Sequence, residues 1–257
     1  MGVTVFRDGF AWIGGAALFG FRGLKELFRP PYEFKETSRQ LFGLGLLSVP
    51  LIALSGLAVG IVMSMHTRSS LERFGAEALI PAALAIAMVK ETGPLVTGLL
   101  VSGRVGAGIG AELGGMRVTE QIDALESLAV DSFKYLVVTR LAACLIALPI
   151  LTSIFNFAAI TGGFIAETVI SGMSLQLYYQ RAFESVQFAD YIPATLKTVV
   201  FGFVIATASC YLGYNTKGGA QGVGSSSTRS VVFSSIALII VNVVLVKTIF
   251  FFFPKAG

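Results

Sequence analysis

Three charged residues stand inside segments that are otherwise apolar. Lys90 and Glu91 interrupt the apolar run 78–103, and Lys197 interrupts the run 191–214. A charge at the centre of a membrane span costs about 3 kcal/mol even on lenient scales, so such residues are functional candidates. Neighbouring helical side chains point about 100° apart, so Lys90 and Glu91 need not pair with each other. Two roles stay open: a Glu91–Lys197 ion pair that fixes helix packing, or contact with a lipid headgroup.

The composition indicates that lipid, rather than water, surrounds most of the chain. Of its 257 residues, 54% are hydrophobic and only 13% are charged, and the mean hydropathy is +0.79. Soluble domains carry about 25% charged residues. The 29 glycines fit the same interpretation, because small residues let membrane helices approach closely.

Five apolar runs are long enough to cross a bilayer, which needs about 20 residues. They are 41–65, 78–103, 141–166, 191–214 and 230–253. An odd number of spans places the two termini on opposite sides of the membrane. Five spans also cannot divide into two equal halves, so a symmetric pathway would require a two-fold dimer.

The lysines and arginines predict the orientation. If the N-terminus is cytoplasmic, the inner segments hold Arg7, Arg22, Lys25, Arg29, Lys35, Arg39, Arg104, Arg117, Lys134, Arg140, Lys217 and Arg229. The outer segments then hold Arg68, Arg73, Arg181, Lys247 and Lys255. This asymmetry favours a cytoplasmic N-terminus and an external C-terminus.

The N-terminal region 1–40 predicts a helix that lies in the membrane interface. Its apolar run 10–21 is too short to span, and Arg22, Lys25 and Arg29 share one helical face after it. Pro30-Pro31 would end the helix. The alternative, a cleaved signal peptide, lacks an A-x-A cleavage site.

An amphipathic segment, 116–130, joins the second run to the third on the predicted cytoplasmic side. Its apolar face would hold Val118, Ile122, Leu125 and Ala129, and its acidic face Glu120, Asp123 and Glu126. We interpret this segment as a cytoplasmic helix on which a soluble partner docks. A helix lying on the membrane is disfavoured, because anionic lipid would repel the acids.

The glycines of 106–114 have two interpretations. Gly106 to Ala111 matches the dinucleotide pattern G-x-G-x-x-G/A, but no βαβ unit surrounds it. Gly106, Gly110 and Gly114 fit better as a small-residue ridge for helix packing. No P-loop motif is present, so ATP hydrolysis through a P-loop would need a separate subunit.

Neither a metal nor a catalytic site is predicted. Cys144 and Cys210 lie in apolar runs, and the single histidine, His66, has no ligand at suitable spacing. No nucleophile–base pair stands within a span, which argues against an intramembrane enzyme. We see no internal repeat and expect one domain, 1–257, with the five spans in 41–253.

Linked motifs extend over most of the chain from about residue 41. They are Glu91-Thr92-Gly93-Pro94, Gly103-Arg104, Ala111-Glu112-Leu113, Met116-Arg117, Thr119 to Leu125, Val130-Asp131, Gly213-Tyr214, Gly219 to Gly224 and Thr228 to Val232. In this order they resemble the MlaE family of ABC-transporter permeases. That family serves the Mla and Mce lipid-transport systems of bacteria and has chloroplast relatives.

The resemblance implies an assembly in the bacterial inner membrane. Two permease copies would pair, two ABC ATPase subunits carrying the ATP and Mg would dock on the cytoplasmic helix, and a periplasmic MCE-domain ring would sit above. A small STAS-type accessory subunit is a further expected partner, and nucleic acid is not. Phospholipid would occupy a cavity between the copies. It would pass between the inner membrane and the MCE carrier, maintaining outer-membrane lipid asymmetry.

The resemblance also implies roles for single residues. Met63, Leu71 and Phe74 match positions that line the lipid cavity, and ordinary packing at the outer end of the first span is the alternative. Lys90, Glu91 and Lys197 join them as substrate-binding candidates. The ATPase contact would hold Arg117, Glu120, Gln121, Asp123 and Glu126. The family can carry a carboxylate where this chain has Asn242, which puts a charge-based role there in doubt.

Two further interpretations remain from the residues themselves. The Gly/Ser-rich segment 215–229 is expected to be a cytoplasmic loop, either a second ATPase contact or a flexible connector. The alternative function is an ion-coupled secondary carrier that uses Glu91 and Lys197. Such a carrier would require acidic residues or histidines within several spans, and only Glu91 clearly meets that requirement. A purely structural scaffold would leave the acidic helix and the charges within the spans without a purpose.

Overall fold

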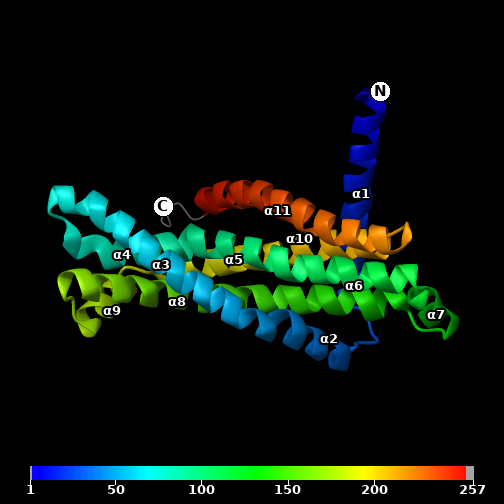
Figure 1. Cartoon of the computed structure of the whole chain (residues 1–257), viewed down its shortest axis with the longest axis horizontal. Helices are drawn as coiled ribbons and strands as arrows, with labels where there is room; N and C mark the ends of the chain where they lie inside the picture. The colour runs from blue at the N-terminus through cyan, green and yellow to red at the C-terminus, as the bar shows by residue number, and fades with distance from the viewer. Residues whose placement is uncertain (1, 253–257) are drawn as a thin grey trace. The chain divides into compact units, whose positions relative to one another are not determined.

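The chain folds almost entirely into helices, as its sequence predicts. The computed structural model describes residues 2–252, with side chains for 13–249 and 251, and contains no strand within that range (Figure 1). Five helical stretches among the described residues are long and apolar enough to span a membrane: Phe34–Phe74, Glu77–Val118, Phe133–Ser171, Phe188–Tyr214 and Gly219–Ile249. Each contains most of one predicted run. Residue 253, the predicted end of the last run, lies outside the described residues.

Several of these spans are built from more than one helical element. The first comprises α2 (Phe34–Gln40), η1 (Leu41–Gly45), η2 (Leu46–Ser48), α3 (Val49–Leu71) and η3 (Glu72–Phe74). The second comprises η4 (Glu77–Leu79), α4 (Ile80–Ala87), η5 (Met88–Thr92), α5 (Gly93–Val101), η6 (Ser102–Gly106) and α6 (Ala107–Val118). The third comprises η7 (Phe133–Val138) and α8 (Thr139–Ser171), and the last two are α10 (Phe188–Tyr214) and α11 (Gly219–Phe252). Segments η1, η5, η6 and η7 are π-helical.

The prediction of a loop over 215–229 is wrong, because α11 begins at Gly219. Only residues 215–218 connect α10 to α11, and Gly218 and Gly219 take the positive φ values of 92° and 64°. The small side chains that suggested a loop instead permit close helix packing. Ser226 Oγ donates to the carbonyl of Gly110 at 3.2 Å, and Ser227 Oγ donates to that of Ala107 at 3.1 Å.

The predicted glycine ridge, which runs from the end of η6 into α6, is confirmed. A Cβ on Gly106 would lie 3.1 Å from Ser209 Oγ, and one on Gly114 would lie 3.0 Å from Thr216 Oγ1. At Gly110 a Cβ would overlap the side chain of Ser230. The lack of side chains at these three glycines therefore allows α10 and α11 to approach the backbone of the second span.

The helix predicted over 116–130 is shorter in the structure. Element α6 continues to Val118, Glu120 adopts a left-handed φ of 58°, and α7 then runs only over Gln121–Ser127. Ile122, from the predicted apolar face, is fully buried, whereas Ala129 follows the helix with a φ of 59°. The left-handed residue breaks the helical register, which a periodicity count across 116–130 assumes to be continuous.

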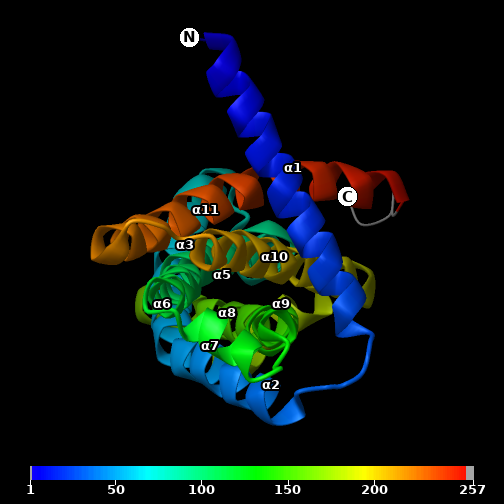
Figure 2. The ribbon, with the colours of Figure 1, turned by 90° about the vertical axis from the view of Figure 1, so that its right-hand side faces the viewer.

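The N-terminal helix, α1 (Gly2–Leu27), is longer than the apolar run that predicted it. The described side chains begin at residue 13, so Arg7 and residues 10–12 lie outside them. Helix α1 crosses α10 (Figure 2). Gly20 packs against Thr207 of α10, where a Cβ would lie 2.7 Å from the threonine methyl. Leu18 and Phe21 remain exposed on α1. Its position in the membrane interface stays a prediction.

The contacts divide the chain into two compact units. Unit 1 comprises residues 1–46, 101–147 and 200–238, and unit 2 comprises residues 47–100, 148–199 and 239–257. In unit 1 the fully buried Ile109, Leu113 and Ile205 form part of the core. An ion pair joins the buried Arg140 to the half-exposed Glu112 at 2.8 Å.

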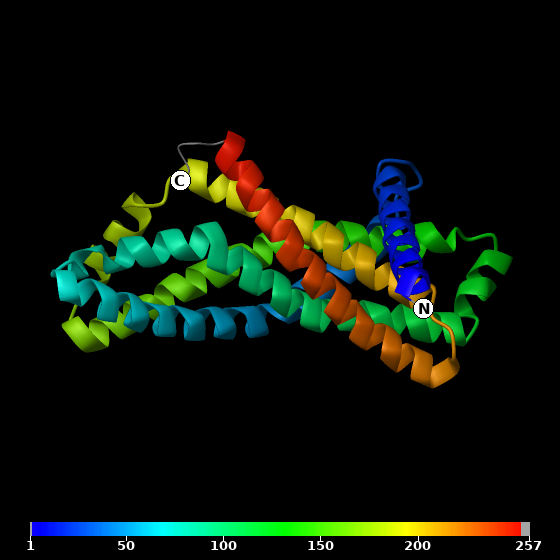
Figure 3. The same ribbon diagram turned by 90° about the horizontal axis from the view of Figure 1, so that it is seen from above.

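In unit 2, α3 and α4 lie side by side (Figure 3). Helix α9 (Leu175–Glu184) packs on α4 and places the fully buried Tyr178 and Ala182 against Ala85 and Ile160. Burial raises the pKa of the Tyr178 phenol, so this side chain stays neutral at physiological pH.

Candidate functional site

The predicted Glu91–Lys197 ion pair is present in unit 2. Lys197 Nζ lies 3.0 Å from Glu91 Oε2 and also donates to the carbonyl of Lys90 at 2.9 Å. The lysine is only 2% exposed, whereas the glutamate side chain keeps 47% of its accessible surface. The pair therefore joins η5 of the second span to α10 of the fourth.

Lys90 makes a second, separate ion pair, which sequence analysis missed. Its Nζ lies 3.1 Å from Asp190 Oδ1. The expectation that Lys90 and Glu91 need not pair with each other agrees with this geometry, because each turns to its own partner on α10. Asp190 stands one residue before the predicted run 191–214, where a charge looks like an ordinary flanking residue.

Asn242 of α11 stands beside this charged cluster. Its Nδ2 lies 3.5 Å from Glu91 Oε2, a long hydrogen bond, and its buried Oδ1 has no partner among the described residues. A cavity of about 30 Å³ adjoins the cluster. Its lining is Lys90, Glu91, Ala189, Asp190, Pro193, Ala194, Val246 and Ile249. That volume suits one water molecule, not a lipid headgroup.

A larger and mostly apolar cavity of about 380 Å³ opens among α8, α9 and α10. Its lining is Val89, Ser153, Asn156, Phe157, Ile160, Phe183, Val186, Gln187, Phe188 and Tyr191. Ser153 Oγ and Tyr191 Oη share a hydrogen bond of 2.6 Å at its edge. Such a lining suits a hydrocarbon chain better than a charged group.

Met63, Leu71 and Phe74 lie outside the charged cluster. Met63 and Leu71 are half-buried on α3, and Phe74, in η3, is 83% exposed. The structure therefore brings Lys90, Glu91 and Lys197 together and places the three apolar candidates elsewhere in unit 2.

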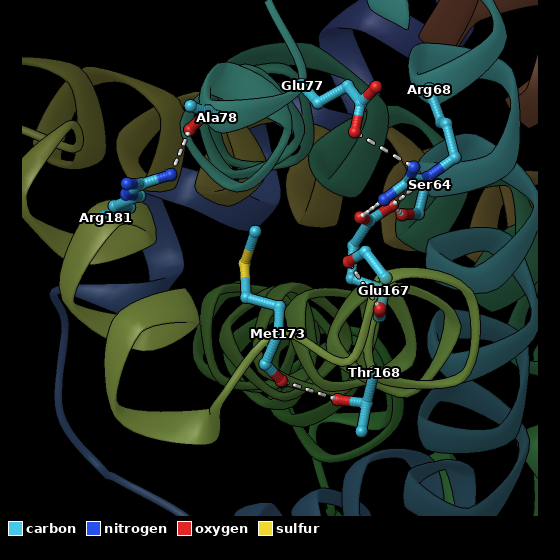
Figure 4. Close-up of polar contacts among 9 residues, drawn as sticks. Ser64, Arg68, Glu77, Ala78, Glu167, Thr168, Met173 and Arg181 are labelled. Atoms are coloured by element: carbon cyan, nitrogen blue, oxygen red, sulfur yellow. Dashed lines mark hydrogen bonds and ion pairs between the residues drawn. The ribbon is translucent and has the colours of Figure 1, made fainter.

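A polar cluster that joins α3 to α8 was missed by sequence analysis (Figure 4). Glu167 is fully buried and accepts hydrogen bonds from Ser64 Oγ at 2.9 Å and from Arg68 Nε at 3.3 Å. Arg68 also forms an ion pair with Glu167 through its Nη2 and reaches Glu77 Oε2 at 3.4 Å. Glu167 follows the uncharged run 141–166 directly, which was the available signal.

The predicted docking residues gather around α7 in unit 1. Glu120 and Gln121 are exposed, and Asp123 Oδ1 accepts a hydrogen bond from Arg117 Nη1 at 2.7 Å. Glu126 is different, because its Oε1 accepts from Ser132 Oγ at 2.6 Å and from Tyr214 Oη at 3.2 Å. This carboxylate therefore ties α7 to the ends of the third and fourth spans.

The burial asymmetry of the Glu91–Lys197 pair leads to a prediction. Glu91→Gln should destabilise the protein more than Lys197→Gln, because it strands a buried ammonium, whereas a half-exposed carboxylate tolerates losing its partner. A buried ion that loses its partner costs about 3–5 kcal/mol. Thermal unfolding in mild detergent measures the order, and Asp190→Asn serves as the matched control on the neighbouring pair. The opposite order would mean that Lys197 is accessible and not buried.

The comparisons with known proteins agree with one another. A sequence model of the family described as Permease MlaE matches residues 37–248. A probable ABC transporter permease protein of Rickettsia bellii is 37% identical over 238 residues, covering 93% of this chain and 92% of the relative. One from Synechocystis is 35% identical over 81% of this chain and 79% of the relative. TRIGALACTOSYLDIACYLGLYCEROL 1, a chloroplastic protein of Arabidopsis thaliana, is 34% identical over 88% of this chain and 63% of its own length.

Proposed function

Because the chain belongs to the family of MlaE permeases, we propose that it is the membrane subunit of an ATP-driven transporter of phospholipid. Its five apolar spans, together with relatives named as ABC transporter permeases, identify a multi-pass membrane permease. The chain carries no P-loop motif, so a separate ATPase subunit would bind the ATP and Mg.

The observation that carries this proposal is the exposed acidic surface at α7. Glu120, Gln121 and Asp123 face away from the core of unit 1, and Glu126 anchors the helix to the chain behind it. A short helix that is exposed on one side and fixed on the other can transmit a movement of a docked subunit to the spans to which it is fixed. We infer that two ABC ATPase subunits dock here, one on each of two permease copies.

The wider assembly follows from the same proposal. A second copy of the chain would complete the lipid cavity, with Met63, Leu71 and Phe74 in its lining. A periplasmic MCE-domain ring would exchange phospholipid with that cavity, and a small STAS-type subunit would accompany the ATPase. The transporter would lie in the bacterial inner membrane with its N-terminus in the cytoplasm, and would maintain outer-membrane lipid asymmetry.

Charge reversal at α7 tests the proposal. The chain would be coexpressed with the genes that neighbour its own, purified by a tag in mild detergent, and analysed for bound protein and lipid by mass spectrometry. The unchanged chain should retain a P-loop ATPase and phospholipid. Glu120→Arg combined with Asp123→Arg should release the ATPase, because it reverses the charge of the docking surface.

Glu184→Arg is the matched control, since Glu184 is an exposed acid on α9 in unit 2. It should leave the ATPase bound. A chain that purifies without any ATPase would refute the ABC assignment, and the ion-coupled carrier built on Glu91 and Lys197 would replace it. Retention of the ATPase by the double variant would refute only the role of α7.

A further inference from the structure

A pocket of about 660 Å³ opens in unit 1 between the N-terminal helix and the end of the fourth span. It shares no residue with the charged cluster at Glu91. Its lining is Gly15, Leu18, Phe19, Arg22, Glu126, Asp131, Ser132, Phe133, Tyr211, Tyr214 and Asn215. These residues come from α1, from α7, from the start of η7 and the segment before it, and from the end of α10 and the turn after it. Figure 2 shows α1 crossing α10 on the way to this region.

Aromatic rings form much of the pocket wall. The centroid of Phe19 lies 5.0 Å from that of Phe133, 5.5 Å from that of Tyr211 and 6.1 Å from that of Tyr214. Aromatic rings attract ammonium groups through the negative charge of their faces. The wall is therefore suited to an organic cation.

Arg22 contributes a positive charge with unused hydrogen-bond donors. Its Cζ lies 4.2 Å from the centroid of the Phe133 ring, and its side chain is exposed. Among the described residues, no carboxylate or carbonyl accepts a hydrogen bond from this guanidinium. A guanidinium presents five N–H donors in a planar fork that matches a phosphate group.

Two carboxylates face the same pocket. Asp131 Oδ1 accepts the backbone N–H of Lys134 at 3.1 Å, and Glu126 is held by Ser132 and Tyr214. With Arg22 as the one basic residue in the lining, the pocket carries both signs of charge. A simple anion would be attracted by Arg22 and repelled by the acids. A ligand that links a phosphate to an ammonium would be attracted both by Arg22 and by the two carboxylates.

The pocket lies at the depth of lipid headgroups. Helix α10 has 27 residues, which corresponds to about 40 Å, close to the thickness of a bilayer with its headgroup layers. Tyr214, the last residue of α10, therefore lies near one membrane surface. Tyrosine is enriched at that level. Leu18 lines the pocket and is 73% exposed, so it can contact the acyl chains of a lipid whose headgroup enters.

We propose that this pocket binds the headgroup of a zwitterionic phospholipid. The phosphate lies against the Arg22 guanidinium, and the ammonium lies among the aromatic rings beside Asp131 and Glu126. Binding here requires neither transport nor the ATPase, so this inference stands or falls separately from the proposed function.

Lipid retention tests the proposal. The full chain would be purified from nanodiscs with equal amounts of phosphatidylethanolamine and phosphatidylglycerol, and the retained lipid measured by native mass spectrometry. The unchanged chain should retain phosphatidylethanolamine in excess. Arg22→Gln should lower that retention about tenfold, because it removes a charge-assisted contact. Asp131→Asn should shift the preference toward phosphatidylglycerol, because it removes the carboxylate that favours an ammonium.

Lys25→Gln is the matched control. Lys25 is an exposed cation one turn further along α1 and does not line the pocket, so its loss should leave retention unchanged. Equal losses from Arg22→Gln and Lys25→Gln, or equal retention of both lipids by the unchanged chain, would overturn the proposal. In the complex purified by coexpression, release of the ATPase by Arg22→Gln without a change in bound lipid would also overturn the proposal, because it would assign the pocket to the ATPase.

A cross-linking measurement avoids dependence on the folding of Arg22→Gln. A photoreactive residue at Leu18 should cross-link to phosphatidylethanolamine more strongly than one at Ile13, which is exposed on α1 outside the pocket lining. Equal cross-linking at the two positions would indicate surrounding bilayer lipid only and would contradict the proposal.

Discussion

Arg68→Leu should destabilise the protein by about 3–5 kcal/mol, because it leaves a fully buried carboxylate without its ion-pair partner. Glu167 has no exposed surface, and Arg68 provides two of the three side-chain donors that it accepts from. Ser64 alone cannot offset the cost of burying that charge. The loss should lower the midpoint of thermal unfolding in detergent by on the order of 10 °C.

Removing both charges should be less damaging than removing the arginine alone. In Arg68→Leu combined with Glu167→Leu no buried charge remains in this cluster, and buried ion pairs can often be replaced by apolar residues at little cost. Glu77→Gln is the control. It removes the other carboxylate that contacts Arg68, at 3.4 Å from Nη1, but Glu77 is half-exposed, so its loss should change stability little. A double variant as unstable as Arg68→Leu would show that the shape of this cluster, and not its charge balance, stabilises the fold.

Gly60→Ala should separate α3 from α8. A Cβ on Gly60 would overlap the carbonyl group of Ala159, which belongs to backbone and cannot rotate away. Gly56, one turn earlier, also faces α8, where a Cβ would lie 2.7 Å from the carbonyl oxygen of Phe155. Overpacking a tight contact costs about 1–3 kcal/mol, and a backbone clash in the middle of two long helices should lie at the upper end.

Gly108→Ala gives the opposite expectation on α6. No atom lies within 4 Å of a Cβ built on Gly108, so alanine should be neutral or stabilise the helix by up to about 1 kcal/mol. Thermal unfolding of the two variants under the same conditions checks both signs. Equal stability of Gly60→Ala and the unchanged chain would mean that α3 and α8 are not packed as closely as described.

The apolar runs predicted the spans well, because bilayer thickness demands an uninterrupted apolar length. The Glu91–Lys197 pair was also foreseeable, because charges inside membrane spans tend to pair with one another. Asp190 and Glu167 were not recognised, because each directly flanks an apolar run, where charges are common. Nothing in hydropathy pairs Arg68 with Glu167, which lies 99 residues away.

The segment 215–229 was misjudged for a different reason. Glycine and serine signal a loop in a soluble protein, but against another helix they provide the space and hydrogen bonds that close contact requires. Ser226 and Ser227 provide both the space and the hydrogen bonds, because their side chains are small and each donates to a carbonyl of α6. Composition alone does not separate these two uses.

The π-helical segments have a consequence for comparing this chain with others. A π turn closes its hydrogen bonds one residue later than an α turn, so each such segment is equivalent to a single inserted residue. In a continuous α-helix one inserted residue would turn everything beyond it by about 100°, whereas a π turn takes up the extra residue and keeps the faces on its two sides aligned. The second span contains two such segments: Met88–Thr92 holds Lys90 and Glu91, and Ser102–Gly106 ends at the first glycine of the ridge. A homologue one residue shorter at either place, with an α turn there, would therefore present the same motifs on the same helix faces.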